Sequence, residues 1–332
     1  MEKKEIVLVL AHGFLGWGED GAVSQRKRER AYFYGVENFL RMEYGGRAGL
    51  ELSIVAPTVP AAQSVEQRGK VLMQSIDSEL EKRSKKTRAH ILAHSMGGLD
   101  ARWVIVQEGM AGKIASLTTI ATPHRGTTIG NWAYQELSPA TMIVRGLFEL
   151  DEVRESIRRQ LPILKETPSD QLEFYNHLLR NYMHASKDQL EQALHALTLE
   201  GSARFNEAQA PLEAAVRART QDRVAYFAYG GRMMPGQTRV LVPTREIIEH
   251  FGTKEETRAC GSENRPCNDG AVSIWSAHYP WDDSGADYVR TLPFDHFMQI
   301  NWRIPDRRPD DALEERLKIL YREIIEKILS VG

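Results

Sequence analysis

A serine flanked by small residues is the first candidate for chemistry in this chain. Ser95 lies in the stretch AHSMGG (93–98), directly after the apolar run AHIL and before residues with a helical pattern. A serine on a sharp turn between a strand and a helix can act as a nucleophile, and the residues two before and two after it must then be small. Ala93 and Gly97 meet this requirement, although glycine is usual at the first position. The alternative is a structural serine that caps the start of a helix.

A serine nucleophile needs a histidine to take its proton and a carboxylate to orient that histidine. On this type of turn the chain order is serine, acid, histidine. Two of the ten histidines come late enough, His278 in WSAHYPW and His296 in LPFDHFMQIN. We favour His296, because His278 follows an expected strand with no loop signal after it. His94 adjoins the serine but is expected to point elsewhere, and His124 in TPHRG is interpreted as structural.

The acid must lie between the serine and the histidine. Asp269 is the best candidate, because it stands on an Asn-Asp-Gly turn ahead of the apolar stretch AVSIW. Any single aspartate is more often a solvated loop residue, so the choice rests on chain order and turn context. The other candidates in this part of the chain are Asp282, Asp283, Asp287 and Asp295.

Acyl chemistry also needs backbone N–H groups that stabilise an oxyanion. One donor would be Met96, the residue after the serine, and the other would come from the loop after an early strand. Here that loop reads AHGFLGWG, in which Gly13 allows a tight turn and Phe14 presents its N–H. The alternative is that His12 and Gly13 form an ordinary turn.

The elements that must position these residues alternate along the chain. Apolar runs rich in β-branched residues predict strands, and residues with helical spacing predict helices between them. The expected strands are 5–11, 52–57, 89–93, 116–122 and 223–231, and the expected helices include 64–86, 98–109 and 311–331. Such alternation predicts an α/β fold with a doubly wound, mostly parallel sheet. We expect one domain over 1–332, with a helical insertion at 128–215 and a turn-rich region at 232–295.

Composition excludes some classes of protein. The chain has 332 residues, is 42% hydrophobic and 27% charged, and carries a net charge of −2. This charge gives no electrostatic footprint for nucleic acid, and no apolar run approaches the ~18 residues of a membrane span. The start, MEKKEIVLVLA, is interpreted as a strand and not as a signal peptide. We therefore expect a cytoplasmic protein, or a secreted one if a leader has been removed.

The two cysteines leave two readings open. Cys260 and Cys267 are seven positions apart and match no zinc motif. They form either one disulfide or two free thiols.

Taken together, these segments resemble the pseudomonad-type bacterial triacylglycerol lipases of the α/β-hydrolase superfamily. The resemblance spans about residues 5–302 and rests on several motifs in the right order. These are HGFLG, AYFYGVENFLRMEYG, HSMGGLDAR, TIATPHRGT, ALHALTLEGSARFNEAQAP, NDGAVS and DHFMQIN. The resemblance implies Ser95 as nucleophile, Asp269 as acid, His296 as base, and Phe14 and Met96 as oxyanion donors. It also implies that part of the 128–200 stretch, within the insertion at 128–215, acts as a lid over the acyl pocket. We expect this lid to contact a lipid interface and the substrate to be a lipid-like ester.

One departure concerns a metal ion. These lipases usually hold a structural calcium ion near the histidine, with an aspartate two residues after it, and here that residue is Met298. We therefore expect no required cofactor and assign no cofactor-binding or metal-binding residues, and a structural calcium ion is left as the alternative.

The resulting expectation is a serine carboxylic-ester hydrolase that acts on lipid-like acyl esters, a triacylglycerol lipase or carboxylesterase, through an acyl-enzyme. An acyltransferase or thioesterase would use the same three residues. A binding protein that keeps the fold without turnover is the alternative from another class.

Overall fold

The structure is a computed structural model, and it describes most of the chain. The described residues are 4–18, 32–135, 177–178, 180–219, 223–235, 237, 241–261, 264–278, 287–302 and 311–331.

A six-stranded sheet forms the centre of the molecule, in the order β2-β1-β3-β4-β5-β6, and every neighbouring pair is parallel. The strands are β1 (Lys4–Ala11), β2 (Leu50–Val55), β3 (Ala89–His94), β4 (Ile114–Ile120), β5 (Ala225–Gly231) and β6 (Tyr288–Leu292). Every residue of β3, β4 and β5 is buried, as apolar strands covered on both faces should be. The predicted parallel sheet is confirmed.

The strand order places helices on both faces. The chain passes from β1 to β2 on one side and then returns to β3 on the other side of β1. Parallel crossovers follow a right-handed rule, and the helices of these two connections accordingly pack against opposite faces of the sheet. The order therefore reverses between β1 and β3, and sheets of this type bind ligands beyond the carboxyl ends of the strands at such a reversal.

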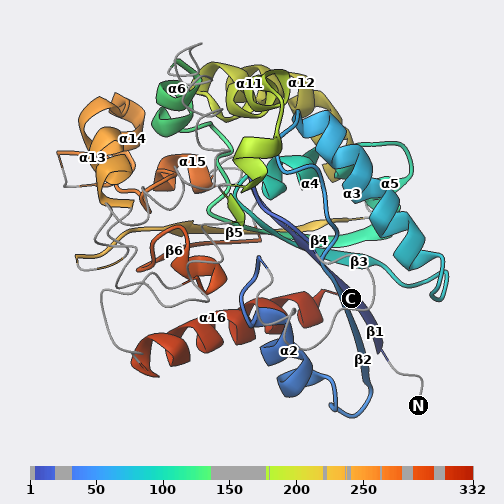
Figure 1. Cartoon of the computed structure of the whole chain (residues 1–332). Helices are drawn as coiled ribbons and strands as arrows, with labels where there is room; N and C mark the ends of the chain where they lie inside the picture. The colour runs from blue at the N-terminus through green and yellow to red at the C-terminus, as the bar shows by residue number, and fades with distance from the viewer. Residues whose placement is uncertain are drawn as a thin grey trace.

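Two helical layers enclose the sheet (Figure 1). One layer contains α2 (Val36–Tyr44) and α16 (Asp311–Ser330), and the other contains α3 (Val65–Leu80), α4 (Gly97–Ile105) and α5 (Met110–Lys113). Alternate residues of β1 point to the two layers: Ile6, Leu8 and Leu10 join the core on the α2 and α16 side, and Val7 and Val9 join the core on the other.

The described part of the region from 128 to 215 is mostly helical. It contains α6 (Thr128–Gln135), α11 (Lys187–Leu197) and α12 (Leu199–Arg217). A buried ion pair between Arg102 of α4 and Glu213 of α12, with a 2.8 Å N–O distance, fastens this region to the layer below. Residues 136–176 of the predicted lid lie outside the described residues, and the division into domain and lid stays a prediction.

The region 232–295, which was expected to be rich in turns, contains several helices and a strand that the sequence patterns did not predict. These are α13 (Val242–Phe251), α14 (Lys254–Arg258), α15 (Ile274–His278) and the edge strand β6. The strand expected before His278 is wrong, because this stretch forms one short helix. The helix expected over 98–109 ends at Ile105, and Gly109 adopts a left-handed φ of 78° before α5 begins. In the described part of the chain, no helix is both long and apolar enough to cross a membrane.

Candidate active site

The turn at Ser95 is strained. Ser95 joins β3 to α4 with a φ of 55°, in the left-handed region that costs a non-glycine residue about 1–2 kcal/mol. Its N–H donates to the carbonyl of Ile120 at 2.9 Å, which holds the turn against the end of β4. A Cβ on Gly97 would lie 2.5 Å from the carbonyl oxygen of Ala11, so this position cannot carry a side chain without movement. The small residues around Ser95 thus have a steric cause, as the sequence pattern predicted.

Asp269 and His296 form a hydrogen-bonded pair. His296 Nδ1 lies 2.9 Å from Asp269 Oδ2, and the His296 backbone N–H donates to the Asp269 carbonyl at 2.9 Å. Asp269 is fully buried, and His296 is 7% exposed. A carboxylate accepts hydrogen bonds, so Nδ1 is the donor to Asp269, and Nε2 is the ring nitrogen that faces away from this partner.

Three further donors fix the carboxylate of Asp269. Its Oδ1 accepts from the backbone N–H groups of Ala271 at 2.9 Å and Val272 at 2.7 Å, within the predicted turn. Its Oδ2 accepts from Gln299 Nε2 at 3.0 Å as well as from His296. Gly231, at the end of β5, makes room for this group: a Cβ there would lie 2.7 Å from that of Asp269. The carboxylate is therefore held in a single orientation toward His296.

The other candidate acids have different partners. Asp295 Oδ1 accepts from the backbone N–H groups of Phe297 at 3.1 Å and Met298 at 2.9 Å, so it stabilises the turn that carries His296. Asp287 pairs with Arg223 and accepts from the N–H of Tyr226, at the amino end of β5. Asp282 and Asp283 lie outside the described residues.

The other candidate histidines also have structural partners. His278 Nε2 lies 3.3 Å from the carbonyl of Arg290 in β6. His124 is fully buried between Arg102 and Thr119. Burial lowers the pKa of His124 well below 6.5, and the nearby Arg102 lowers it further.

The loop after β1 lies against Ser95. A Cβ on Gly13 would be 2.7 Å from that of Ser95. His12 Nε2 accepts from the N–H of Val59 at 3.2 Å, so its Nδ1 carries the proton and donates to the Gly13 carbonyl at 3.0 Å. Among the described residues, no hydrogen-bond acceptor is present for the N–H of Phe14 or Met96. Both predicted oxyanion donors are thus unpaired in the described structure.

Arg68 is hydrogen-bonded to the backbone of the loop after β1. It is fully buried in α3 and forms an ion pair with Asp100, which is 1% exposed, at 2.8 Å. It also donates to the carbonyls of His12 at 2.9 Å and Gly13 at 3.3 Å. Burial raises the pKa of Asp100 to about 6, although the neighbouring Arg68 acts in the opposite direction. The sequence pattern gives no signal for this role of Arg68, because an arginine in an amphipathic helix ordinarily faces solvent.

Replacing Arg68 by methionine is expected to lower the free energy of unfolding by about 3–5 kcal/mol, because it leaves the Asp100 carboxylate buried and unpaired. Urea unfolding would measure this change. The double substitution Arg68→Met and Asp100→Leu is expected to recover a large part of the loss, because it removes both charges. A single variant as stable as wild type would contradict this account of the pair.

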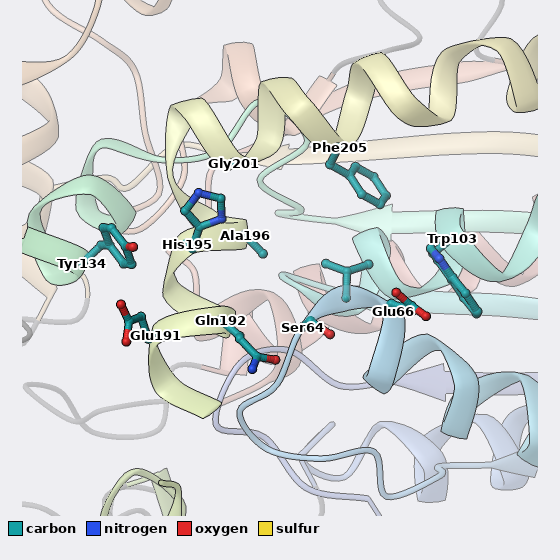
Figure 2. A pocket seen from close by; sticks show the side chains of 11 residues that line it. Ser64, Glu66, Trp103, Tyr134, Glu191, Gln192, His195, Ala196, Gly201 and Phe205 are labelled. Carbon is teal, nitrogen blue, oxygen red and sulfur yellow. The ribbon is translucent and has the colours of Figure 1, made fainter. Parts of the chain in front are cut away.

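A pocket that these residues do not line is shown in Figure 2. It has a volume of about 480 Å³ and lies between the start of α3, α4, α6, α11 and α12. Trp103 and Phe205 stand at one end, and Tyr134, His195 and Glu191 stand at the other. The lining includes neither Ser95 nor His296, and an apolar cluster that contains Met96 and Leu190 packs beside it.

The residue at the calcium position does not suit calcium. Met298 is buried in a short 3-10 helix, Met298–Ile300. Calcium takes six to eight oxygen ligands, and a thioether is too soft to replace one. Within the described ranges, no group of three or more His, Cys, Asp or Glu side chains could hold a metal ion. No chemistry is assigned to a metal here.

The two cysteines are paired. Cys260 and Cys267 form a disulfide with Cα atoms 5.4 Å apart. The bridge lies two residues before Asp269, so it constrains the chain that leads into the turn of the acid. The sequence alone left this pairing open.

Comparisons with known proteins show which family model and which relative this chain resembles in sequence. Residues 60–137, which include Ser95, match the family described as PGAP1-like alpha/beta domain. Triacylglycerol lipase 2 of Saccharomyces cerevisiae is 26% identical over 307 residues, or 90% of this chain and 71% of the yeast protein.

Two solved structures share the fold. The mature lipase BlEst2 of Bacillus licheniformis has a TM-score of 0.54 at 14% identity, with 90% of this chain and 87% of that chain covered. Lipase 1 from Pelosinus fermentans has a TM-score of 0.53 at 16% identity, with 96% and 98% covered. The narrower likeness to pseudomonad-type lipases stays a prediction. This chain is thus similar in sequence to a yeast triacylglycerol lipase over most of its length, and it shares its fold with two solved lipases.

Proposed function

We propose that this protein hydrolyses lipid-like acyl esters through Ser95, His296 and Asp269, with an acyl-enzyme on Ser95. The observation that carries the proposal is the buried Asp269–His296 pair beside a serine on a strained strand-to-helix turn. His94, the neighbour of Ser95, is hydrogen-bonded to the His296 carbonyl at 3.0 Å. This bond places the turn of Ser95 next to the loop of His296.

Proton transfer follows from the ring orientation of His296. With Nδ1–H held by Asp269, Nε2 accepts the Ser95 hydroxyl proton as Oγ attacks the ester carbonyl carbon. The resulting imidazolium is stabilised by the Asp269 carboxylate. Nε2 then returns the proton to the leaving alcohol as the carbon–oxygen bond breaks. Water repeats the sequence on the acyl-enzyme, giving its proton to Nε2 and releasing the carboxylic acid and Ser95.

The negative charge on the carbonyl oxygen develops beside the N–H groups of Phe14 and Met96. These groups have no acceptor among the described residues, so they need not break a hydrogen bond in order to donate. Met96 also precedes the first turn of α4, where the helix dipole favours negative charge. Removing one oxyanion donor commonly costs about 10²–10³ in rate, which shows the size of the contribution.

A lipid-like acyl group is supported by the surroundings of Ser95 and by the relatives. Phe14, Met96 and Leu99 belong to an apolar cluster beside the turn, together with Leu190 and Leu197 of α11. One relative is named a triacylglycerol lipase, and two proteins with the same fold are named lipases. In the proposal, the insertion at 128–215 contacts the lipid phase as a lid, and no metal ion takes part.

A serine-directed p-nitrophenyl phosphonate tests this proposal. We expect one equivalent of p-nitrophenol per protein molecule, loss of turnover, and a mass increase on the peptide that contains Ser95. Initial rates on p-nitrophenyl esters from acetate to palmitate then give the acyl preference, with an optimum at long chains expected. A label elsewhere, or no label with active turnover, would overturn the assignment of the nucleophile. A short-chain optimum would overturn the lipid-like substrate and leave an esterase.

A further inference from the structure

Two buried side chains connect the three parts of the proposed site. The Tyr32 hydroxyl lies 2.8 Å from His94 Nδ1, and His94 Nε2 lies 3.0 Å from the backbone oxygen of His296. The rings of His94 and His296 are packed together, with centroids 4.5 Å apart. Tyr32 is 5% exposed and His94 is fully buried. The hydrogen bond between His94 and His296 joins residues 202 positions apart in the sequence.

The partners fix the proton on His94. A carbonyl oxygen can only accept, so Nε2 carries the proton and donates it to His296. Nδ1 is then the acceptor, and the Tyr32 hydroxyl donates to it. Burial lowers the pKa of His94 well below 6.5, with a further contribution from His296, so the ring stays neutral. The chain of donors therefore runs in one direction, from Tyr32 through His94 to the His296 backbone.

Tyr32 is itself anchored at both ends. Its carbonyl accepts from the indole N–H of Trp302 at 2.6 Å. A Cβ on Gly13 would lie 2.8 Å from its hydroxyl oxygen, so this hydroxyl borders the loop of the oxyanion donors. The Tyr32–His94 unit thus touches the oxyanion loop, the turn of the nucleophile and the loop of the base.

We propose that Tyr32 and His94 are positioning residues, which hold the backbone of His296 at the distance from Ser95 and the oxyanion loop that proton transfer requires. This inference rests on the proposed function. Asp269 fixes the orientation of the His296 ring, whereas His94 fixes the position of its backbone relative to the strand that ends in the nucleophile. Misplacement of a catalytic group by about 1 Å can cost about 100-fold in rate.

The test compares kcat and KM of variants on one p-nitrophenyl ester. His94→Phe keeps a buried ring but removes the donor, and we expect kcat to fall about 100-fold with KM nearly unchanged. His94→Gln keeps an amide donor and is expected to recover kcat to within about 10-fold of wild type. Tyr32→Phe removes a single oxygen atom and is expected to lower kcat about 10-fold. The double variant Tyr32→Phe and His94→Phe should be no slower than His94→Phe, because the two residues act as one unit.

His90→Gln is the matched control. His90 lies at the other end of β3, is 3% exposed, and is hydrogen-bonded to Ser116 at 2.8 Å. Its replacement disturbs the same strand to a similar degree but does not reach His296, so we expect kcat to remain at the wild-type value.

The outcomes separate this inference from the function on which it rests. Wild-type protein without turnover that depends on Ser95 overturns both. Normal wild-type turnover with unchanged kcat per folded molecule in His94→Phe and Tyr32→Phe overturns the positioning role alone. If His94→Phe does not fold, His94→Gln and Tyr32→Phe decide: wild-type kcat in both overturns the role, and a lower kcat in Tyr32→Phe supports it.

Discussion

Replacing Ser95 by alanine is expected to lower kcat/KM on every p-nitrophenyl ester by at least about 10⁴-fold, as for other serine nucleophiles. The His296–Asp269 pair would remain, but no group would be left to form the acyl-enzyme. Residual turnover over water would come from the oxyanion donors and from substrate binding. Initial-rate measurements at a high protein concentration would detect such residual activity.

The fold should not change, because alanine meets the same left-handed backbone as serine and leaves no large cavity. Thermal unfolding and phosphonate labelling check this point: the variant should unfold like wild type and take up no label. Ser202→Ala is the control, since Ser202 is fully buried in α12 and bonds only locally, to Leu199. Wild-type turnover in Ser95→Ala would end the assignment of the nucleophile.

Lowering the pH from 7 to about 4.5 is expected to unfold the protein, because buried histidines cannot take up protons in the folded state. Burial, with the help of Arg68, lowers the pKa of His12 to about 3. Burial also lowers the pKa of His90 to about 3, with contributions from Lys4 and Arg88. The pKa values of His94 and His124 lie well below 6.5 for the same main reason.

The direction of the effect follows from proton uptake. Below about pH 6.5 the unfolded chain protonates these four histidines, whereas burial opposes their protonation in the folded chain, so stability falls as the pH falls. Asp100 acts in the opposite direction, because its folded pKa of about 6 exceeds its unfolded value. The net difference of about three protons gives about 4 kcal/mol per pH unit, against a total stability of about 5–15 kcal/mol for typical proteins.

Urea unfolding at pH values from 7.5 to 5 measures this slope. His90→Gln removes one buried histidine far from Ser95. It should lower the number of protons taken up on unfolding, which sets this slope, by about one. A wild-type slope below one proton per molecule would contradict the account.

The sequence was sufficient for features with a local steric or burial cause. Five of the six strands are fully or largely apolar, and each was predicted within a few residues. The turn at Ser95 was recognisable because its geometry excludes side chains at Gly97, and the turn at Asp269 because Gly270 has a φ of 94°. The chain order of serine, acid and histidine then selected Asp269 and His296, which the structure brings together.

The remaining features depend on contacts between distant segments. β6 is half exposed along YVRTL and lacks a continuous apolar run, so its place at the edge comes from pairing with β5. His94 was expected to point away from the site, but its partners, Tyr32 and His296, lie 62 and 202 positions away. Arg68 and Gln299 are polar residues of types that usually lie at the surface. Their roles come from contacts with the loop after β1 and with Asp269. No residue pattern within one segment could indicate these roles.

The position of β6 has a consequence for how the protein loses activity. Among the described strands, this five-residue strand pairs with β5 alone, and it lies in the stretch of chain between the acid turn and the histidine loop. Edge elements with few buried contacts open locally at a lower free energy than the centre of a sheet. Warming or mild denaturant would therefore separate Asp269 from His296 while β1, β3 and β4 remain paired. Loss of activity on heating would then occur at a lower temperature than global unfolding. The half-life of activity would therefore measure the local stability of β6 and not the stability of the whole fold.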